Sequence, residues 1–152
     1  MKTQLMVLCI GLAACQADAQ KINEKDVPAI VKNSLTKSFG EQSAKWDKEG
    51  ENFEASFKAK GKETSVVFDA AGSILETEVE IKKSELPASV SEILKKDFAN
   101  AKIEEVAKID TKGVTTYEVE VEIGEDSFDL IFDAQGKLIK KEKKEDDEEE
   151  EG

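Results

Sequence analysis

The residues that could do chemistry in this sequence are carboxylates, and they recur at every second position. Two segments carry such triplets: Glu76, Glu78 and Glu80, and Glu118, Glu120 and Glu122. Because alternate residues of a strand point to the same face, each triplet lines one face of its strand. Neighbouring carboxylates repel one another, which raises their pKa values or attracts a cation such as Ca²⁺. The six glutamates are therefore candidate metal ligands; the alternative is a solvated face with lysine neighbours such as Lys58, Lys140 and Lys141.

A second acidic motif, Phe-Asp-Ala-x-Gly, occurs twice, at Phe68–Gly72 and Phe132–Gly136. Each copy offers a single carboxylate, Asp69 or Asp133, whereas Ca²⁺ takes about six to eight oxygen ligands. The motif instead favours a tight turn, in which the Asp side chain bonds the turn backbone and Gly adopts a positive φ angle.

The usual catalytic groups are missing. The chain has no histidine, and its two cysteines, Cys9 and Cys15, both lie near the start. Histidine-dependent triads, zinc-ligand spacings and Gly-rich phosphate loops are therefore absent. A Ser–Lys dyad is the one remaining arrangement, and no motif marks it. The sequence predicts a protein that is not an enzyme and needs no cofactor.

The first 19 residues have the three parts of a secretory signal peptide. Lys2 supplies the positive charge, Leu5–Ala14 are apolar, and small residues follow up to Ala19. As a helix, Leu5–Ala14 would span roughly 15 Å, about half of a bilayer core, and no later segment is apolar enough to cross a membrane. The sequence therefore predicts export without a transmembrane helix.

The cleavage site can be placed in two ways. Cleavage after Ala19 would release a soluble chain that begins at Gln20. Cleavage before Cys15, at a Leu-Ala-Ala-Cys stretch similar to a bacterial lipoprotein signal, would shorten the leader to residues 1–14 and let Cys15 carry a lipid anchor. Both alternatives stay open, with a slight preference for the soluble form.

Charge is concentrated at the end of the chain. The formal net charge is −12, and the run EDDEEEE, residues 145–151, contains seven of the negative charges. Such a run repels itself and has nothing apolar to bury, so residues 145–152 are predicted to form a disordered tail. The scattered lysines argue against a nucleic-acid partner. A cationic partner or a divalent cation would complement the charge.

An internal repeat organises the rest of the chain. Asp26–Ala29 and Glu85–Ala88 match at an offset of 59, and the two Phe-Asp-Ala-x-Gly motifs match at an offset of 64. The ordered series of matches predicts two copies of one unit, residues 20–82 and 83–144.

Each copy reads as a helix followed by antiparallel strands. Apolar residues recur at helical spacing after Pro28 and Pro87, and period-two alternation follows in both copies. The predicted strands are 44–48, 53–59, 63–69 and 74–81, and then 103–109, 117–123, 127–133 and 138–143. The predicted fold is α+β, with two tandem helix-plus-strand repeats forming one sheet of about eight antiparallel strands and helices on one face.

A helix, a strand meander and a Phe-Asp-x-x-Gly turn into a last strand together resemble the PepSY-like domains, whose fold is similar to the β-lactamase-inhibitor protein. The resemblance covers roughly residues 24–143 and extends to the exported PepSY-like periplasmic proteins of Bacteroidetes-type bacteria. It implies a small periplasmic binding or inhibitory module, with the uncovered sheet face as its contact surface. No inhibitory residue of the family can be matched to this chain.

Two functional hypotheses follow. The first is a non-catalytic module that binds an envelope protein or peptide through the open sheet face, where Glu54, Glu118, Glu120 and Glu122 are candidate contacts. Trp46, the only tryptophan, is most simply a core residue; if exposed, it would be an interface anchor. The second hypothesis is a Ca²⁺-binding acidic envelope protein, which would use the glutamate strands and the tail.

Overall fold

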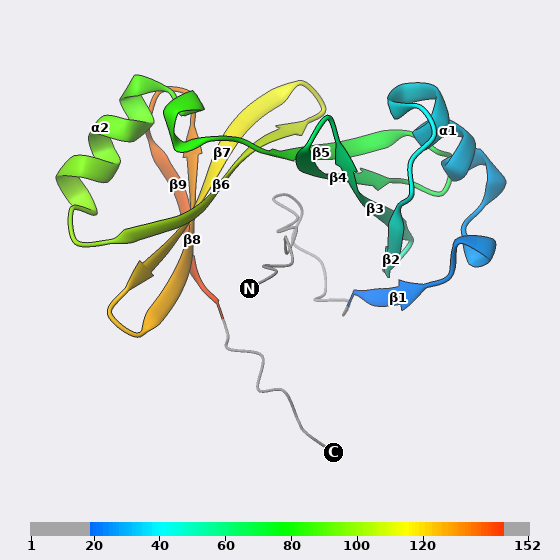
Figure 1. Cartoon of the computed structure of the whole chain (residues 1–152), viewed down its shortest axis with the longest axis horizontal. Helices are drawn as coiled ribbons and strands as arrows, with labels where there is room; N and C mark the ends of the chain where they lie inside the picture. The colour runs from blue at the N-terminus through cyan, green and yellow to red at the C-terminus, as the bar shows by residue number, and fades with distance from the viewer. Residues whose placement is uncertain (1–18, 145–152) are drawn as a thin grey trace, which may run out of the picture. The chain divides into compact units, whose positions relative to one another are not determined.

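The computed structural model describes residues 19–144, which form two α-helices and nine strands (Figure 1). The predicted leader up to residue 18, including Cys15, and the predicted acidic tail, residues 145–152, lie outside the described residues. Neither described helix is long and apolar enough to cross a membrane.

The elements follow one another in a simple order. They are β1 (Gln20–Ile22), α1 (Ala29–Phe39), β2 (Lys45–Glu49), β3 (Asn52–Ala59), β4 (Lys62–Phe68), β5 (Ile74–Glu80), α2 (Ala88–Asp97), β6 (Lys102–Thr111), β7 (Val114–Ile123), β8 (Asp126–Asp133) and β9 (Leu138–Lys143). A short 3₁₀ turn precedes each helix, at Glu24–Asp26 and Lys83–Glu85.

The strands form one antiparallel sheet in the order of the sequence, from β1 to β9. The α+β class is confirmed, but the sheet has nine strands rather than about eight. The additional strand is β1, which pairs with β2 over only three residues, Gln20 to Ile22. Three residues are too few to show the alternation by which the other strands were recognised.

The chain divides into two compact units. Unit 1 runs to Glu80 and includes Ile109–Val114, and unit 2 comprises Ile81–Lys108 and the residues from Thr115 onward. The last part of β6 thus belongs to unit 1, although it follows α2 in the sequence.

Within each unit the helix packs on one face of its strands. In unit 1, Val31 and Leu35 of α1 share a core with Trp46, Phe57 and Phe68. The matching core of unit 2 includes these residues of α2, β7 and β8: Val90, Leu94, Val119, Val121, Leu130 and Phe132. Burial of such apolar surface is the main driving force for folding.

The two Phe-Asp-Ala-x-Gly motifs form tight turns, as predicted. The Oδ1 atom of Asp69 accepts hydrogen bonds from the backbone N–H groups of Ala71 and Ser73, at 3.0 and 2.8 Å. The Oδ1 atom of Asp133 accepts the equivalent bonds from Gln135 and Lys137, both at 2.9 Å.

Glycine is required in these turns for two reasons. Gly72 and Gly136 have φ angles of 82° and 86°, which residues with a Cβ atom rarely adopt. Each also lies against the first turn of its unit's helix. A Cβ atom on Gly72 would lie 3.0 Å from the carbonyl oxygen of Ile30, and one on Gly136 would lie 2.7 Å from that of Ser89. The turn before β5 and the turn before β9 therefore each pack against the start of their unit's helix.

Candidate functional site

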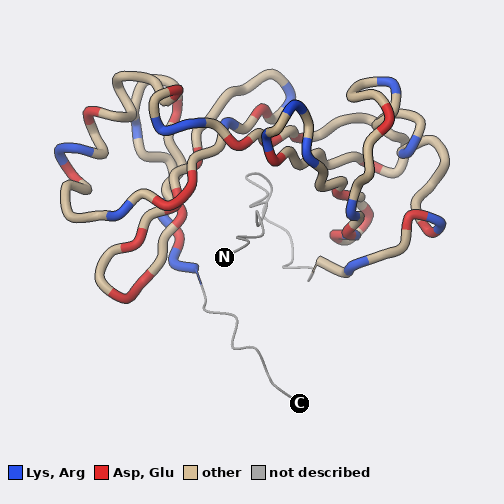
Figure 2. The backbone as a smooth tube through the Cα atoms, viewed as in Figure 1, with Lys and Arg blue, Asp and Glu red and all other residues tan. Residues whose placement is uncertain are grey.

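The side of the strands opposite the helix carries acidic residues in both units, and we call it the carboxylate face. In unit 1, Glu54 of β3 lies opposite Val67 of β4, which lies opposite Glu76 of β5. In unit 2, Glu118 and Glu120 of β7 alternate with the core residues Val119 and Val121. Acidic residues recur along the strands of both units rather than in one segment (Figure 2).

The alternative of a solvated face is wrong at the centre of the carboxylate face. Glu54 and Glu118 are only 6% and 8% exposed, and Glu76, Glu78 and Asp129 are also buried. Only the rim matches the prediction: the side chain of Glu122 is 44% exposed and lies 3.5 Å from the ammonium group of Lys102. A residue on an inner strand has neighbours on both adjoining strands, and their side chains exclude water from the centre of the row.

Glu54 is held by hydroxyl groups. The Oγ atom of Ser65 donates a hydrogen bond to its Oε1 atom at 2.6 Å, and the Oγ atom of Ser56 donates to the same atom at 3.3 Å. Burial raises the pKa of Glu54 to about 7, with smaller contributions from the charges of Glu49 and Asp47, while the two hydroxyls oppose the shift.

Glu76 accepts one hydrogen bond, from a hydroxyl group on β6. The Oγ1 atom of Thr111 on β6 donates to its Oε2 atom at 2.8 Å, while Oε1 has no hydrogen-bond partner among residues 19–144. Burial is the largest cause that raises the pKa of Glu76, and Thr111 opposes it. Glu80, the third member of this predicted triplet, is only partly buried at the end of β5.

Glu118 has a different environment in unit 2. Burial is the main cause that raises its pKa to about 8; the charge of Asp129 contributes to this rise, and the ammonium group of Lys144 opposes it. Asp129 lies opposite Glu120, and burial raises its pKa as well. The Nζ atom of Lys144 lies 2.9 Å from Oε2 of Glu120 and 4.0 Å from Oδ1 of Asp129. One lysine thus lies beside three acidic residues.

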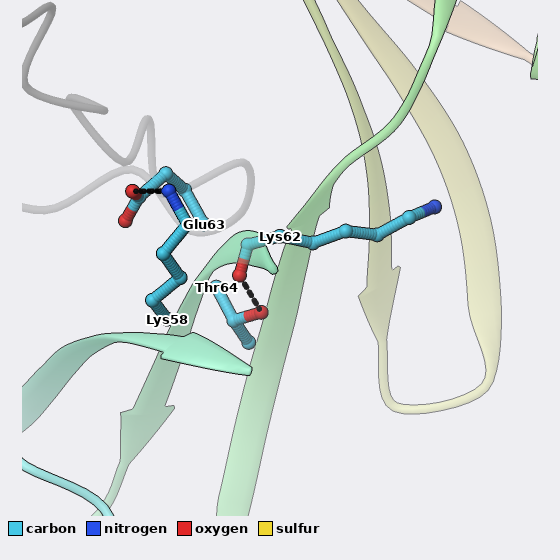
Figure 3. Close-up of polar contacts among 4 residues, drawn as sticks. All are labelled: Lys58, Lys62, Glu63 and Thr64. Atoms are coloured by element: carbon cyan, nitrogen blue, oxygen red, sulfur yellow. Dashed lines mark hydrogen bonds and ion pairs between the residues drawn. The ribbon is translucent and has the colours of Figure 1, made fainter. Parts of the chain in front are cut away.

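An exposed ion pair at the end of the β3–β4 hairpin shows the contrast with these buried groups. The Nζ atom of Lys58 lies 3.2 Å from Oε1 of Glu63, and both side chains are largely exposed (Figure 3). Next to this pair, within β4, the hydroxyl group of Thr64 donates to the carbonyl oxygen of Lys62 at 3.4 Å. Such exposed pairs contribute little to stability.

The six predicted metal ligands are divided between the two units. Glu76, Glu78 and Glu80 belong to unit 1, whereas Glu118, Glu120 and Glu122 belong to unit 2. Within residues 19–144, no group of three or more acidic residues is arranged to hold a metal ion.

Trp46 is a core residue, so the alternative of an exposed interface anchor is wrong. It is 5% exposed, and its ring lies 6.3 Å from that of Phe68, measured between centroids. It lies opposite Ala55, which places it on the helix side of β2. Of the predicted contact residues, only Glu120 and Glu122 keep partly exposed side chains.

Sequence analysis missed Ser65, Asp129 and Lys144. The alternation of Phe128, Asp129 and Leu130 was a usable signal for the position of Asp129. Lys144 carried no such signal, because its role depends on how the chain continues beyond β9.

The chain matches one protein family and several solved structures. Residues 14–76 and 51–140 match the family described as "Putative beta-lactamase-inhibitor-like, PepSY-like". A BLIP-like protein from Bacteroides fragilis is 27% identical with a TM-score of 0.66, and the match covers 79% of this chain and 89% of that chain. No curated protein sequence matches the chain.

Two further structures share the fold at lower identity. A DUF2874 family protein from Bacteroides uniformis is 20% identical with a TM-score of 0.71, covering 76% of this chain and 88% of that chain. A protein from Bacteroides eggerthii, described among "putative periplasmic proteins", is 16% identical with a TM-score of 0.73, covering 77% and 88%.

Proposed function

Since the chain belongs to the PepSY-like, β-lactamase-inhibitor-like family, we propose that it is an exported, non-catalytic module that binds a protein or peptide of the cell envelope through its carboxylate face. The observation that carries the proposal is the face itself. It combines buried carboxyl groups held in fixed positions with a partly exposed rim at Glu120 and Glu122. The charged side chains of the rim would select a partner by electrostatic complementarity more than they would strengthen binding.

Export and the state of the N-terminus are part of this proposal. The leader of residues 1–19, or 1–14 with a lipid on Cys15, would deliver the protein to the periplasm. The description of the Bacteroides eggerthii relative as periplasmic supports this location. Cleavage after Ala19 would leave β1 intact, because that strand begins at Gln20.

A tandem repeat is also proposed, with copies at residues 20–82 and 83–144 and both helices on one face of the sheet. Support comes from the matching turns, in which Gly72 and Gly136 lie against Ile30 and Ser89. Ile30 and Ser89 are themselves related by the offset of 59 that relates the two helices.

Capture from native envelope extract tests the binding proposal. The tagged mature protein would be used at about 0.3 M salt, where charge attraction beyond roughly one Debye length is screened. We expect one stoichiometric partner that is retained by Glu92→Lys, an exposed change on α2, and lost by Glu122→Lys, the same charge reversal on the carboxylate face. Equal retention by both variants, or an empty capture, would count against the carboxylate face as the contact surface.

The alternative, a Ca²⁺-binding envelope protein, has less support because the described carboxylates form no metal-binding group. Calorimetric titration with Ca²⁺ separates the two functions. Heat from the mature protein that persists after removal of residues 145–152 would favour a built cation site, and heat that disappears with them would assign the binding to the polyelectrolyte run.

A further inference from the structure

Three residues form a row across the carboxylate face of unit 1, and we call them the unit 1 row. Val67 on β4 lies between Glu54 on β3 and Glu76 on β5, and all three side chains are on the face opposite α1. Adjacent strands are about 4.8 Å apart, so the Cα atoms of the two glutamates are about 10 Å apart. The row thus has an apolar centre with a carboxyl group on each side.

The unit 1 row lacks a positive charge. Glu76 is 5% exposed, and its Oε1 atom has no hydrogen-bond partner among the described residues. The charged groups that act on Glu54 are Glu49 and Asp47, and Glu49 also acts on Glu76. All of these neighbours are acidic. Because an unpaired carboxylate is costly to bury, a cationic group that reached the row would bind favourably.

The corresponding row of unit 2 contains a lysine. The offset of 64 residues that relates the two Phe-Asp-Ala-x-Gly motifs also relates the unit 1 row to three residues of unit 2: Glu118, Ile131 and Lys140. The strand register agrees, because Ile131 lies opposite both Glu118 and Lys140. The charge of Lys140 lowers the pKa of the nearby Asp129 and so opposes the effect of burial. Unit 2 therefore has its own ammonium group at the position where unit 1 has Glu76.

We propose that the unit 1 row binds a lysine side chain of the partner, with the alkyl stem on Val67 and the ammonium group between the carboxylates of Glu54 and Glu76. This inference rests on the proposed function and names the group that the carboxylate face of unit 1 recognises. A lysine side chain matches both parts of the row, since its stem is apolar and its end is charged. Ca²⁺ takes about six to eight oxygen ligands, more than two carboxyl groups supply.

The row can be reached without unfolding of unit 1. Neither α1 nor a described strand of unit 1 covers it, because α1 packs on the opposite face and the strands all lie in the sheet. Side chains of the neighbouring strands exclude water from the row, and side chains change rotamer without breaking the hydrogen bonds between strands. The ammonium group would donate to Oε1 of Glu76, since Thr111 already donates to Oε2.

Carboxyl ¹³C NMR of the mature protein tests the lysine site. The probe is the peptide acetyl-Ala-Ala-Lys-Ala-Ala-amide, and its control has norleucine in place of lysine, which keeps the apolar stem without the charge. The spectra would be recorded at about 0.15 M salt, which screens attraction between distant charges. We expect the lysine peptide to shift the signals of Glu54 and Glu76 and the norleucine peptide to leave them unchanged. Equal shifts with both peptides, or no shift with the lysine peptide, would overturn the proposal.

Three variants make the test specific. Glu76→Gln removes one of the two charges and should weaken binding of the lysine peptide about tenfold. Glu76→Lys introduces the residue type that unit 2 has at this position and should prevent binding, so the test remains if one variant does not fold. Glu63→Gln is the matched control on the same face of β4 as Val67, and it should bind as wild type because the side chain of Glu63 is 49% exposed. Undiminished binding by both Glu76 variants, or an equal loss in Glu63→Gln, would contradict the site.

Capture from envelope extract with Glu76→Gln separates the lysine site from the proposed function. Loss of the stoichiometric partner in this variant would support both. A partner retained as well by Glu76→Gln as by the wild type would overturn the lysine site and leave the proposed function in place. An empty capture, together with binding of the lysine peptide, would support the site and count against the proposed function.

Discussion

Glu54 of unit 1 and Glu118 of unit 2 occupy matching places, each one strand position before a buried core residue, Ala55 or Val119. Both are nearly inaccessible to water, yet the two units meet the cost of burial in different ways. Around Glu54 the neighbours are hydroxyl donors, and around Glu118 they are other carboxylates and one ammonium.

The difference shows in the pKa values. Hydroxyl donors stabilise the ionised form of Glu54 and so oppose the effect of burial, which raises its pKa to about 7. Glu118 has the charge of Asp129 beside it and a lysine that only partly offsets it, and its pKa rises to about 8. Burial therefore raises the pKa in both units, while the immediate neighbours decide how far the pKa of each carboxyl group rises.

The largest effect expected of a single substitution concerns the glycine turns, where the two units also differ. Gly136→Ala should destabilise the protein by about 3 kcal/mol, because the new methyl group would meet the backbone of Ser89 at 2.7 Å in a left-handed conformation. Gly72→Ala, with a closest distance of 3.0 Å, should cost about 2 kcal/mol. Urea unfolding measures both.

Gly113→Ala is the matched control for these two substitutions. Its φ angle is 86° and nothing lies within 4 Å of the added atom, so only the backbone conformation opposes the change, at about 1 kcal/mol. Equal losses in the three variants would show that the contacts with the helices contribute nothing.

The pH dependence of stability combines the contributions of both units. Glu54 and Glu118 have folded-state pKa values of about 7 and about 8, above the unfolded value of 4.5. Their protonation therefore stabilises the fold fully below about pH 4.5, and this contribution is lost as the pH rises through 7 and 8. From these values we expect the free energy of unfolding to fall by about 6 kcal/mol between about pH 5 and pH 9, with the larger share from Glu118.

Single substitutions divide this fall between the units. Glu54→Gln should remove the part of this fall in stability that is complete by about pH 7. Glu118→Gln should remove the part that continues to about pH 8. The lowered pKa values of Asp69 and Glu104 act in the opposite direction, but only at more acidic pH. A wild-type protein that becomes more stable from pH 5 to pH 9 would refute the assignment.

Removal of a hydroxyl donor should have a smaller effect, confined to unit 1. Ser65→Ala deletes the 2.6 Å hydrogen bond to Glu54 and should cost about 1 to 2 kcal/mol at about pH 8, where Glu54 is ionised. Ser56→Ala, which removes the longer 3.3 Å bond, should cost less. Urea unfolding at about pH 8 checks this order, and a larger loss for Ser56→Ala would contradict it.

The smallest effect is expected at the exposed ion pair of the β3–β4 hairpin. Glu63→Gln should change the free energy of unfolding by less than about 0.5 kcal/mol, because both partners are largely exposed. A loss as large as that of Ser65→Ala would mean that exposure does not distinguish the rim from the centre of the face.

Much of the fold could be predicted from periodicity. The apolar spacing after Pro28 and Pro87 located both helices, and the bounds predicted for the last strand, Leu138–Lys143, agree with β9. The turns at the two Phe-Asp-Ala-x-Gly motifs could also be predicted, together with the role of Asp in bonding the turn backbone. A single carboxylate followed by small residues suits a turn better than a metal site.

The character of the carboxylate face could not be read from alternation alone. Alternation shows that Glu118 and Val119 point to opposite faces, but not whether the face of Glu118 is wet. Exposure depends on which residues lie across the strands, such as Ile131 opposite Glu118 and Val67 opposite Glu54. That register is a tertiary property. The position of Lys144 also depends on tertiary structure, because it follows from how the chain continues beyond β9.

The measurement that tests this account most directly is a carboxyl ¹³C NMR titration of the mature protein. It reads the ionisation of Glu54 and Glu118 individually, without substitutions. The account predicts midpoints near pH 7 for Glu54 and near pH 8 for Glu118. Midpoints of both residues near the ordinary value of 4.5 would show that the centre of the carboxylate face is solvated, and would contradict the account.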